Sequence, residues 1–199
     1  MSGLKALLVD LDGTLVDTAE ANFAAYRAAL QAHGVTLTRE WWDANGFGRN
    51  WREFLPALLD GNSNVRSAEI AARKAELYPN YVAATLVNEP LVRLIRLLKP
   101  SLRLALVTSA SRSAAALLLE VHDLRSLFDE VVTGDDVTAH KPAPHAFALA
   151  AERLGVRPDE CMIIEDSEAG IAAAAAFGAP CLVVENFADG QFTDLALAS

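Results

Sequence analysis

The sequence predicts an α/β fold, with a Rossmann-like doubly wound parallel sheet as its core and a small helical domain inserted after the first strand. Short apolar runs of strand length alternate with helical patterns over most of the chain. These runs are continuously apolar, as expected for parallel strands that are covered on both faces. A long stretch with helical patterning separates the first two runs, which indicates an insertion rather than a loop.

Five strands are expected in the core, each followed by turn or cap residues. They are Lys5–Val9, Leu102–Val107, Glu130–Val132, Cys161–Ile164 and Cys181–Val184. Apolar residues at helical spacing predict four helices between them, at Leu91–Leu98, Arg112–Val121, Pro144–Leu154 and Glu168–Phe177. Alternating strands and helices of this kind favour a parallel sheet with right-handed crossovers.

The insertion is expected over residues 18–87, which leaves 1–17 and 88–199 as the α/β core. Helical patterns cover Phe23–Leu30, Trp51–Leu59 and Ala68–Leu77, and no strand is expected among them. The insertion also holds an aromatic cluster, which is expected to form its core, with stacking on a ligand as the alternative: Trp41, Trp42, Phe47, Trp51 and Phe54.

Composition excludes several classes of protein. With 52% apolar and 22% charged residues the chain is typical of a globular protein and not of a disordered one. A net charge of −9 argues against nucleic-acid binding, because a phosphate backbone would be repelled. Neither a signal peptide nor a membrane-spanning segment is expected, so we predict a cytoplasmic protein without a membrane partner. Cys161 and Cys181 lie in apolar runs and are expected to be buried free thiols.

Polar residues follow the predicted strands at their carboxyl ends, where an open parallel sheet forms its ligand-binding crevice. The residues concerned are Asp10, Asp12, Thr108, Ser109, Lys141, Glu165 and Asp166. Any one of them could be a helix cap or a turn residue, which is the role expected for Ser111 and Ser167. As an ordered set, however, they predict a common site.

Four motifs give the chain a family resemblance. They are Asp10-Leu-Asp12-Gly13-Thr14-Leu-Val-Asp17-Thr18, Leu-Val-Thr108-Ser109, Lys141-Pro-Ala-Pro144, and Ile-Ile-Glu165-Asp166-Ser167-x-Ala-Gly170-Ile171. In these motifs the chain resembles the haloacid dehalogenase (HAD) superfamily, in its beta-phosphoglucomutase and phosphoglycolate phosphatase-like branch. The resemblance extends from residue 10 to 171, and it implies that the helical insertion is the cap domain of this branch.

The chemistry of phosphoryl transfer agrees with the roles that the resemblance implies. Asp10 would attack phosphorus and form an aspartyl phosphate, while Asp12 would act as general acid and then as general base. The Thr108 hydroxyl and the Ser109 backbone would hold phosphoryl oxygens. Lys141 would bind the same oxygens and neutralise the charge that develops on them.

A cation is expected because a phosphate dianion beside carboxylates is otherwise repelled. Mg²⁺ suits the site, since it is hard and prefers oxygen ligands. The resemblance implies its ligands: the Asp10 carboxylate, the Asp12 backbone carbonyl and Asp166, with Glu165 nearby.

Four residues of the insertion are candidates for substrate binding. Gly46-Phe47-Gly48-Arg49 resembles the Gly-x-x-Arg specificity loop of the branch, so Arg49 would bind a substrate phosphate or carboxylate, or else be an ordinary surface arginine. Lys74 is either a second contact or a solvated lysine. Asn22 occupies the position at which beta-phosphoglucomutase carries a histidine, and this difference favours hydrolysis over mutase activity.

The sequence therefore predicts a Mg²⁺-dependent phosphatase that hydrolyses a small phosphorylated metabolite, a sugar phosphate or a phosphoglycolate-like compound, through an aspartyl phosphate. A mutase of the beta-phosphoglucomutase type is the alternative. A remoter one is a non-catalytic receiver-like domain that accepts a phosphoryl group, although receivers are shorter and lack the Asp-x-Asp-Gly-Thr pattern.

Overall fold

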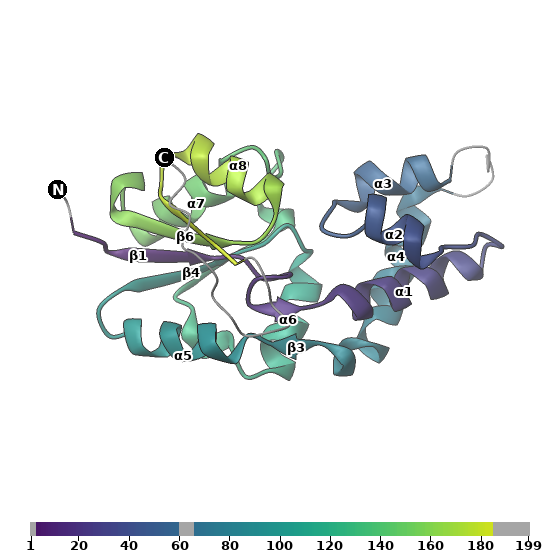
Figure 1. Cartoon of the computed structure of the whole chain (residues 1–199), viewed down its shortest axis with the longest axis horizontal. Coiled ribbons are helices and arrows are strands. Elements are labelled where there is room, and N and C mark those ends of the chain that lie inside the picture. The colour runs from purple at the N-terminus through teal and green to yellow at the C-terminus, as the bar shows by residue number, and fades with distance from the viewer. Residues whose placement is uncertain (1–2, 60–65, 185–199) are drawn as a thin grey trace. The chain divides into compact units, whose positions relative to one another are not determined.

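The computed structural model describes residues 3–59 and 66–184 (Figure 1). The chain divides into two compact units. One unit comprises the chain up to Asp17 and from Val87 onward, and the other comprises Thr18–Leu86. Within the described part of the chain, no helix combines the length and the apolar content that crossing a membrane would require.

The first unit is built on a five-stranded sheet with the strand order β5-β4-β1-β6-β7. The strands are β1 (Ala6–Val9), β4 (Arg103–Val107), β5 (Glu130–Val132), β6 (Cys161–Glu165) and β7 (Cys181–Val183). Every pairing in the sheet is parallel, and Val9 at the end of β1 lies opposite Leu106 on one side and Ile164 on the other. Because β1 is central, its carboxyl end lies between those of β4 and β6.

Helices cover both faces of this sheet. They are α5 (Glu89–Leu98), α6 (Arg112–Val121), α7 (His145–Leu154) and α8 (Glu168–Phe177). In Figure 1, α7 and α8 lie on one side of the sheet and α5 and α6 on the other. Leu8, Ala105 and Ile163 pack with Phe147 and Ala173 in the core on the α7–α8 side. The predicted fold class, a doubly wound parallel sheet, is confirmed.

Local signals explain where these helices begin and end. Ser111 and Ser167 are the N-caps of α6 and α8, and each side chain accepts a hydrogen bond from a backbone N–H of the first turn, as predicted. Gly155 and Gly178 end α7 and α8 at φ values of 67° and 84°. Glycine adopts this left-handed conformation without the steric cost of a Cβ.

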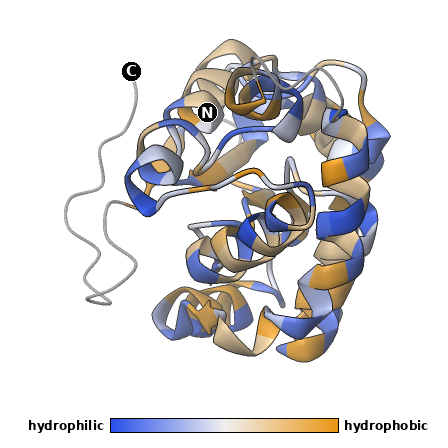
Figure 2. Cartoon of the chain, turned by 90° about the vertical axis from the view of Figure 1, so that its right-hand side faces the viewer, coloured by the Kyte–Doolittle hydropathy of each residue, from blue (hydrophilic) through white to orange (hydrophobic). Residues whose placement is uncertain are grey.

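The second unit is helical. It contains α1 (Ala19–Gln31), α2 (Arg39–Asn45), α3 (Trp51–Leu58), α4 (Ser67–Leu77) and the short 3₁₀ turns η1 (Tyr78–Asn80) and η2 (Val82–Ala84). The helices carry both hydrophobic and hydrophilic residues (Figure 2), and in α1 the buried residues Phe23, Tyr26 and Leu30 recur at helical spacing, so this helix is amphipathic. The ring of Phe54 lies edge-on to those of Tyr26 and Trp42, with centroid distances of 5.1 and 5.5 Å.

Three features of the second unit and its boundaries differ from the sequence predictions. Phe47 is 44% exposed and not part of the aromatic core, because it belongs to the turn after α2. The helix α2 was not predicted. A two-stranded sheet of β2 (Val16–Asp17) and β3 (Leu86–Val87) forms where no strand was expected. Two-residue strands are too short to produce a periodic pattern in the sequence.

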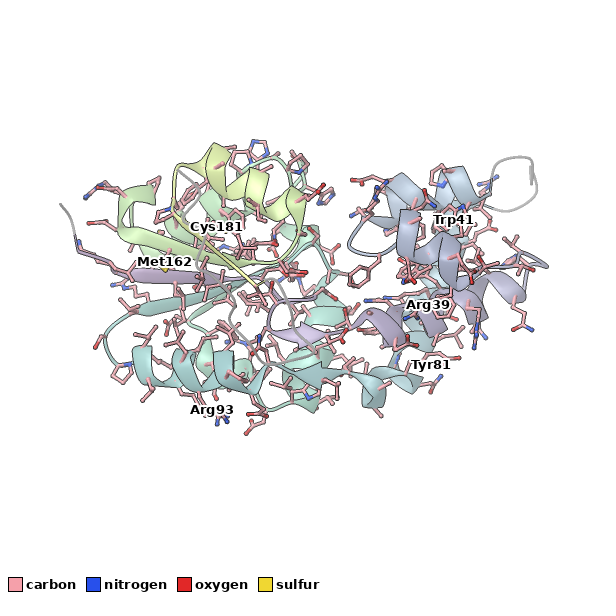
Figure 3. The ribbon with its side chains drawn as sticks, in the orientation of Figure 1. Arg39, Trp41, Tyr81, Arg93, Met162 and Cys181 are labelled. Atoms are coloured by element: carbon pink, nitrogen blue, oxygen red, sulfur yellow. The ribbon has the colours of Figure 1, made fainter. Side chains whose placement is uncertain are left out.

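Both cysteines are free and buried in the strands of the first unit, as predicted. Figure 3 shows Cys181 and Met162 in this sheet. Burial raises the pKa of the Cys161 and Cys181 thiols to about 11, so both remain protonated and unreactive near neutral pH.

Candidate active site

The strand order of the sheet brings the sequence motifs to one edge. Asp10 follows β1, and its backbone N–H donates to the Ile164 carbonyl of β6 at 3.0 Å. Thr108 follows β4, and its N–H donates to the Val132 carbonyl of β5 at 2.9 Å. Both residues thus continue the hydrogen-bonding of the sheet by one position, so the first turn after each strand starts from a rigid support.

A buried lysine links two of the motif carboxylates. Lys141 Nζ lies 2.6 Å from Asp10 Oδ1, 2.6 Å from Glu165 Oε1 and 3.1 Å from the Val107 carbonyl oxygen. The exposed fraction of the side chain is 5% for Lys141, 8% for Asp10 and 1% for Glu165. With all three ammonium donors engaged, Lys141 is held in a single position between the two carboxylates.

Glu165 is bound through both of its carboxylate oxygens. Oε1 accepts from Lys141, while Oε2 accepts from the backbone N–H groups of Asp166 and Ser167 at 2.8 Å and from the Ser167 hydroxyl at 2.9 Å. A Cβ at Gly170 would lie only 1.8 Å from Oε1. The absence of a side chain at Gly170 therefore makes room for this carboxylate.

Asp166 is positioned from the first motif. Thr14 Oγ1 donates to Asp166 Oδ1 at 2.7 Å. Gly13 adopts a φ of 87°, and a Cβ there would lie 2.2 Å from Asp166 Oδ2. The loop after β1 therefore needs a glycine both for its own conformation and to let the Asp166 carboxylate approach.

Asp12 and Thr108 also meet. The Thr108 hydroxyl donates to Asp12 Oδ2 at 3.3 Å and accepts from the Ala110 N–H at 3.0 Å. Side-chain contacts thus bring together the core residues that the sequence singled out: Asp10, Asp12, Thr108, Lys141, Glu165 and Asp166. Ser109 follows Thr108 directly and is exposed.

The electrostatics of this cluster show an excess of negative charge. Burial, together with Glu165, Asp166 and Asp12, raises the pKa of Asp10 well above its usual value, although Lys141 opposes the shift. Burial and the neighbouring Glu165 also raise the pKa of Asp166 to about 7, against the Thr14 hydrogen bond and Lys141. Burial lowers the pKa of Lys141, but Asp10 and Glu165 more than offset this and raise it above its usual value.

This donor set fits a divalent cation. Carboxylate oxygens of Asp10, Glu165 and Asp166 lie within 4.8 Å of one another. One ammonium does not balance the nearby carboxylates, and a hard cation would relieve the repulsion that raises the pKa values of Asp10 and Asp166. Since both Glu165 oxygens already accept hydrogen bonds, Asp10 and Asp166 are the better placed ligands of the three.

The candidate residues of the second unit have local surroundings of their own. Gly46 ends α2, where a Cβ would lie 2.3 Å from the Trp42 ring, and Arg49 is exposed. Lys74 is half-buried, with Nζ 3.9 Å from the centroid of the Tyr78 ring, so it is not simply a solvated lysine. Asn22 donates to Thr18 Oγ1 at 3.0 Å. Their roles in substrate binding remain predictions.

Sequence reasoning did not assign roles to Thr14 and Gly170. Both belong to motifs that were recognised. Thr14, however, contacts Asp166 of a distant motif, and Gly170 matters because the Glu165 carboxylate packs against it. Neither contact can be inferred from the order of residues within a motif. Ser167 was expected only as a helix cap, and it also donates to Glu165.

Comparison with known proteins settles the family. The family model described as haloacid dehalogenase-like hydrolase matches residues 4–178, which include all of the motifs and the helical insertion. The chain belongs to the haloacid dehalogenase-like hydrolase family.

Several HAD-like relatives cover nearly the whole chain. The fructose-1-phosphate phosphatase YqaB of Escherichia coli is 32% identical over 173 residues, which are 86% of this chain and 92% of the relative. A phosphorylated carbohydrates phosphatase of Thermotoga maritima is 33% identical over 193 residues, covering 94% and 89% of the two chains.

Solved structures of HAD-like proteins share the fold. CbbY from Rhodobacter sphaeroides in complex with phosphate superimposes with a TM-score of 0.83 at 27% identity, covering 97% of this chain and 91% of CbbY. A putative beta-phosphoglucomutase from Thermotoga maritima gives a TM-score of 0.73 at 29% identity, covering 95% and 89%. The predictions of the family and of a HAD-like phosphatase as its enzyme class are confirmed.

Proposed function

We propose that this HAD-like enzyme is a Mg²⁺-dependent phosphatase that hydrolyses a small phosphorylated metabolite through an aspartyl phosphate on Asp10. The supporting observation is the contact of Lys141 with both Asp10 and Glu165 beside the Asp166 carboxylate. A buried ammonium and closely spaced carboxylates provide a nucleophile, a counter-charge for phosphoryl oxygens and the ligands of a hard cation.

The first step is the transfer of the phosphoryl group to the protein. Lys141 holds Oδ1 of Asp10, which orients the other carboxylate oxygen for attack on phosphorus. The new Asp10 oxygen–phosphorus bond forms as the bond from phosphorus to the substrate oxygen breaks. Asp12 donates a proton to that leaving oxygen, and the contact from the Thr108 hydroxyl orients the Asp12 carboxyl group.

The second step returns the protein to its starting state. Asp12, now ionised, takes a proton from water as the water oxygen bonds to phosphorus and the bond to Asp10 breaks. Inorganic phosphate leaves, and both aspartates regain their original protonation states. The Ser109 backbone N–H binds a phosphoryl oxygen in both steps, and Lys141 supplies positive charge from its position beside Asp10.

The cation site is formed by this chain's own oxygens. Asp10 and Asp166 would hold Mg²⁺ together with the backbone carbonyl of Asp12, and Glu165 would keep Lys141 in place beside them. When bound, Mg²⁺ supplies positive charge that reduces the repulsion between the phosphate and the carboxylates. Thr14 fixes the orientation of the Asp166 carboxylate toward this site.

The substrate class is proposed to be a sugar phosphate or a phosphoglycolate-like compound. Relatives whose names specify fructose 1-phosphate and phosphorylated carbohydrates support the first, and relatives named phosphoglycolate phosphatase support the second. The helical unit serves as the cap that selects among such substrates, with Arg49 as the residue that binds a substrate anion.

A screen of phosphorylated metabolites tests this proposal. Phosphate release from p-nitrophenyl phosphate, a panel of sugar phosphates and phosphoglycolate is measured with Mg²⁺ and with EDTA. We expect turnover only with the cation. Asp10→Asn should reduce it below about 1% of the unmodified rate, because an amide is a poor nucleophile. Activity that survives EDTA, or an active Asp10→Asn variant, would contradict the mechanism.

The mutase alternative keeps one argument in its favour, the similarity to a putative beta-phosphoglucomutase. Product analysis with a hexose 1-phosphate separates the two activities, since a phosphatase releases inorganic phosphate and a mutase forms an isomeric sugar phosphate. Asn22 in place of a histidine favours release. The receiver-like alternative is not proposed, because the hydrolase family match spans residues 4–178, which include all four motifs.

A further inference from the structure

The loop after β4 is tied to the segment after β5. We call residues 108–112 the phosphate loop, because it carries Thr108 and Ser109, and residues 133–136 the clamp segment. The Gly134 N–H donates to the Ala110 carbonyl oxygen at 2.8 Å, and Asp135 Oδ2 accepts from the Arg112 N–H at 2.8 Å. Two successive residues of the clamp segment thus bind backbone groups that follow Ser109 in the chain.

Close packing adds to these hydrogen bonds. A Cβ at Gly134 would lie 2.5 Å from the Ser109 carbonyl oxygen and 3.2 Å from that of Ala110. Both neighbours are backbone atoms, so a side chain at this position could be accommodated only by moving the phosphate loop. The Ser109 carbonyl therefore rests directly against the Gly134 backbone.

The clamp segment is itself anchored through Asp136. Its Oδ2 accepts from the Thr133 N–H at 2.9 Å and from the Thr133 hydroxyl at 2.7 Å. Its Oδ1 accepts from Arg112 Nη2 at 2.8 Å and from Arg153 Nη2 at 3.1 Å. Because these contacts reach α6 and α7, the clamp segment is a rigid support and not a free loop.

These contacts leave the backbone N–H of Ser109 available for a ligand. The Ala110 N–H is bound by the Thr108 hydroxyl and the Ala110 carbonyl by Gly134. Among residues 3–59 and 66–184, no hydrogen-bond acceptor faces the backbone N–H of Ser109, which is an exposed residue. The Gly134 N–H holds the Ala110 carbonyl, and the Gly134 backbone packs against the Ser109 carbonyl, so together these contacts limit how the loop can rotate.

We propose that Gly134 and Asp135 are positioning residues that aim the Ser109 N–H at the phosphoryl group. They touch neither substrate nor cation and act through the backbone of the phosphate loop. The inference rests on the proposed phosphatase function. A donor that is oriented before the reaction needs no reorganisation as charge develops on the phosphoryl oxygens, so a rotated loop should weaken phosphate binding and slow turnover.

The test compares Gly134→Ala, Asp135→Ala and Asp135→Asn with the unmodified protein. Gly178→Ala is the matched control, because it forces a Cβ into a left-handed helix end with nothing within 4 Å, and thus costs stability without touching the loop. For each protein we measure kcat and KM with p-nitrophenyl phosphate, the affinity for inorganic phosphate by calorimetry, the half-saturating Mg²⁺ concentration and the melting temperature.

Misdirecting one donor should lower kcat/KM and phosphate affinity on the order of 10-fold in Gly134→Ala and Asp135→Ala, with half-saturating Mg²⁺ changed less than about twofold. Asp135→Asn keeps an acceptor oxygen and should recover most of the loss. Gly178→Ala should have a lower melting temperature but an unchanged affinity for inorganic phosphate. Equal phosphate affinity in all five proteins would overturn the proposal, and so would losses that follow melting temperature alone.

These outcomes are distinct from failure of the proposed function. Phosphate binding without turnover by the unmodified protein would contradict the phosphatase assignment, whereas the calorimetric comparison would still decide the role of the clamp segment. An unmodified protein that neither binds nor releases phosphate would overturn both.

Discussion

Gly170→Ala is expected to destabilise the protein, although the same change usually stabilises a helix. Gly170 lies in the first turn of α8, where alanine is favoured over glycine by up to about 1 kcal/mol. The new Cβ would lie 1.8 Å from Glu165 Oε1, so the carboxylate has to retreat by about 1.5 Å to reach an ordinary contact distance. Such a retreat stretches the 2.6 Å contact with Lys141 beyond hydrogen-bonding range.

The expected loss of stability follows from the hydrogen bond and ion pair that Glu165 makes with Lys141. A hydrogen bond to a charged group contributes about 1.5–3 kcal/mol, and disrupting a buried ion pair costs about 3–5 kcal/mol. After subtracting the helix preference, we expect the free energy of unfolding to fall by about 2–4 kcal/mol, which lowers the melting temperature by roughly 4–16 °C in a chain of this size. Because Lys141 is released from its position, kcat should fall on the order of 100-fold.

Melting temperatures and kcat are measured for the unmodified protein, Gly170→Ala, Glu165→Ala and the double variant, with melting recorded in EDTA. In the Glu165→Ala background the clash is gone, so the same glycine substitution should be neutral or stabilising, and the two changes should be strongly non-additive. Ala172→Gly, at an exposed position of α8, measures the helix preference alone. A Gly170→Ala protein that melts at or above the unmodified temperature with normal kcat would refute this reasoning.

Three further predictions concern the cation and the substrate. Thr14→Val removes the hydrogen bond to Asp166 and should raise the half-saturating Mg²⁺ concentration about 10-fold, while Thr14→Ser should not. An unchanged Mg²⁺ titration of Thr14→Val would contradict this role of Thr14. Since the pKa of Asp166 is raised from 3.8 to about 7, the metal-free folded protein binds more protons than the unfolded chain between these values. Its unfolding free energy should fall as pH rises through that window, and Mg²⁺ should raise the melting temperature more at about pH 8 than at about pH 5.5; equal increments argue against it. Arg49→Ala should raise KM for the preferred substrate about 10-fold, with Arg73→Ala as a control that leaves KM unchanged.

The strands and helices of the core were predictable because each one leaves a local pattern. Continuous apolar runs identified all five strands of the sheet, and Arg112–Val121 and Glu168–Phe177 were predicted with the bounds that the structure has. The elements that were missed are short. The helix α2 has seven residues, and β2 and β3 have two each, so their formation depends on what they pack or pair with and not on a periodic sequence.

The amino-acid sequence alone determined the family, the sheet and the residues that gather at its edge, because parallel strands carry whatever follows them to the same side. Tertiary structure decided how those residues are used. It showed that both oxygens of Glu165 are bound, that Gly170 makes room for them and that Gly134 lies against Ser109. Such contacts join atoms from segments as far apart as Thr14 and Asp166, and only the folded chain sets the space and direction between them.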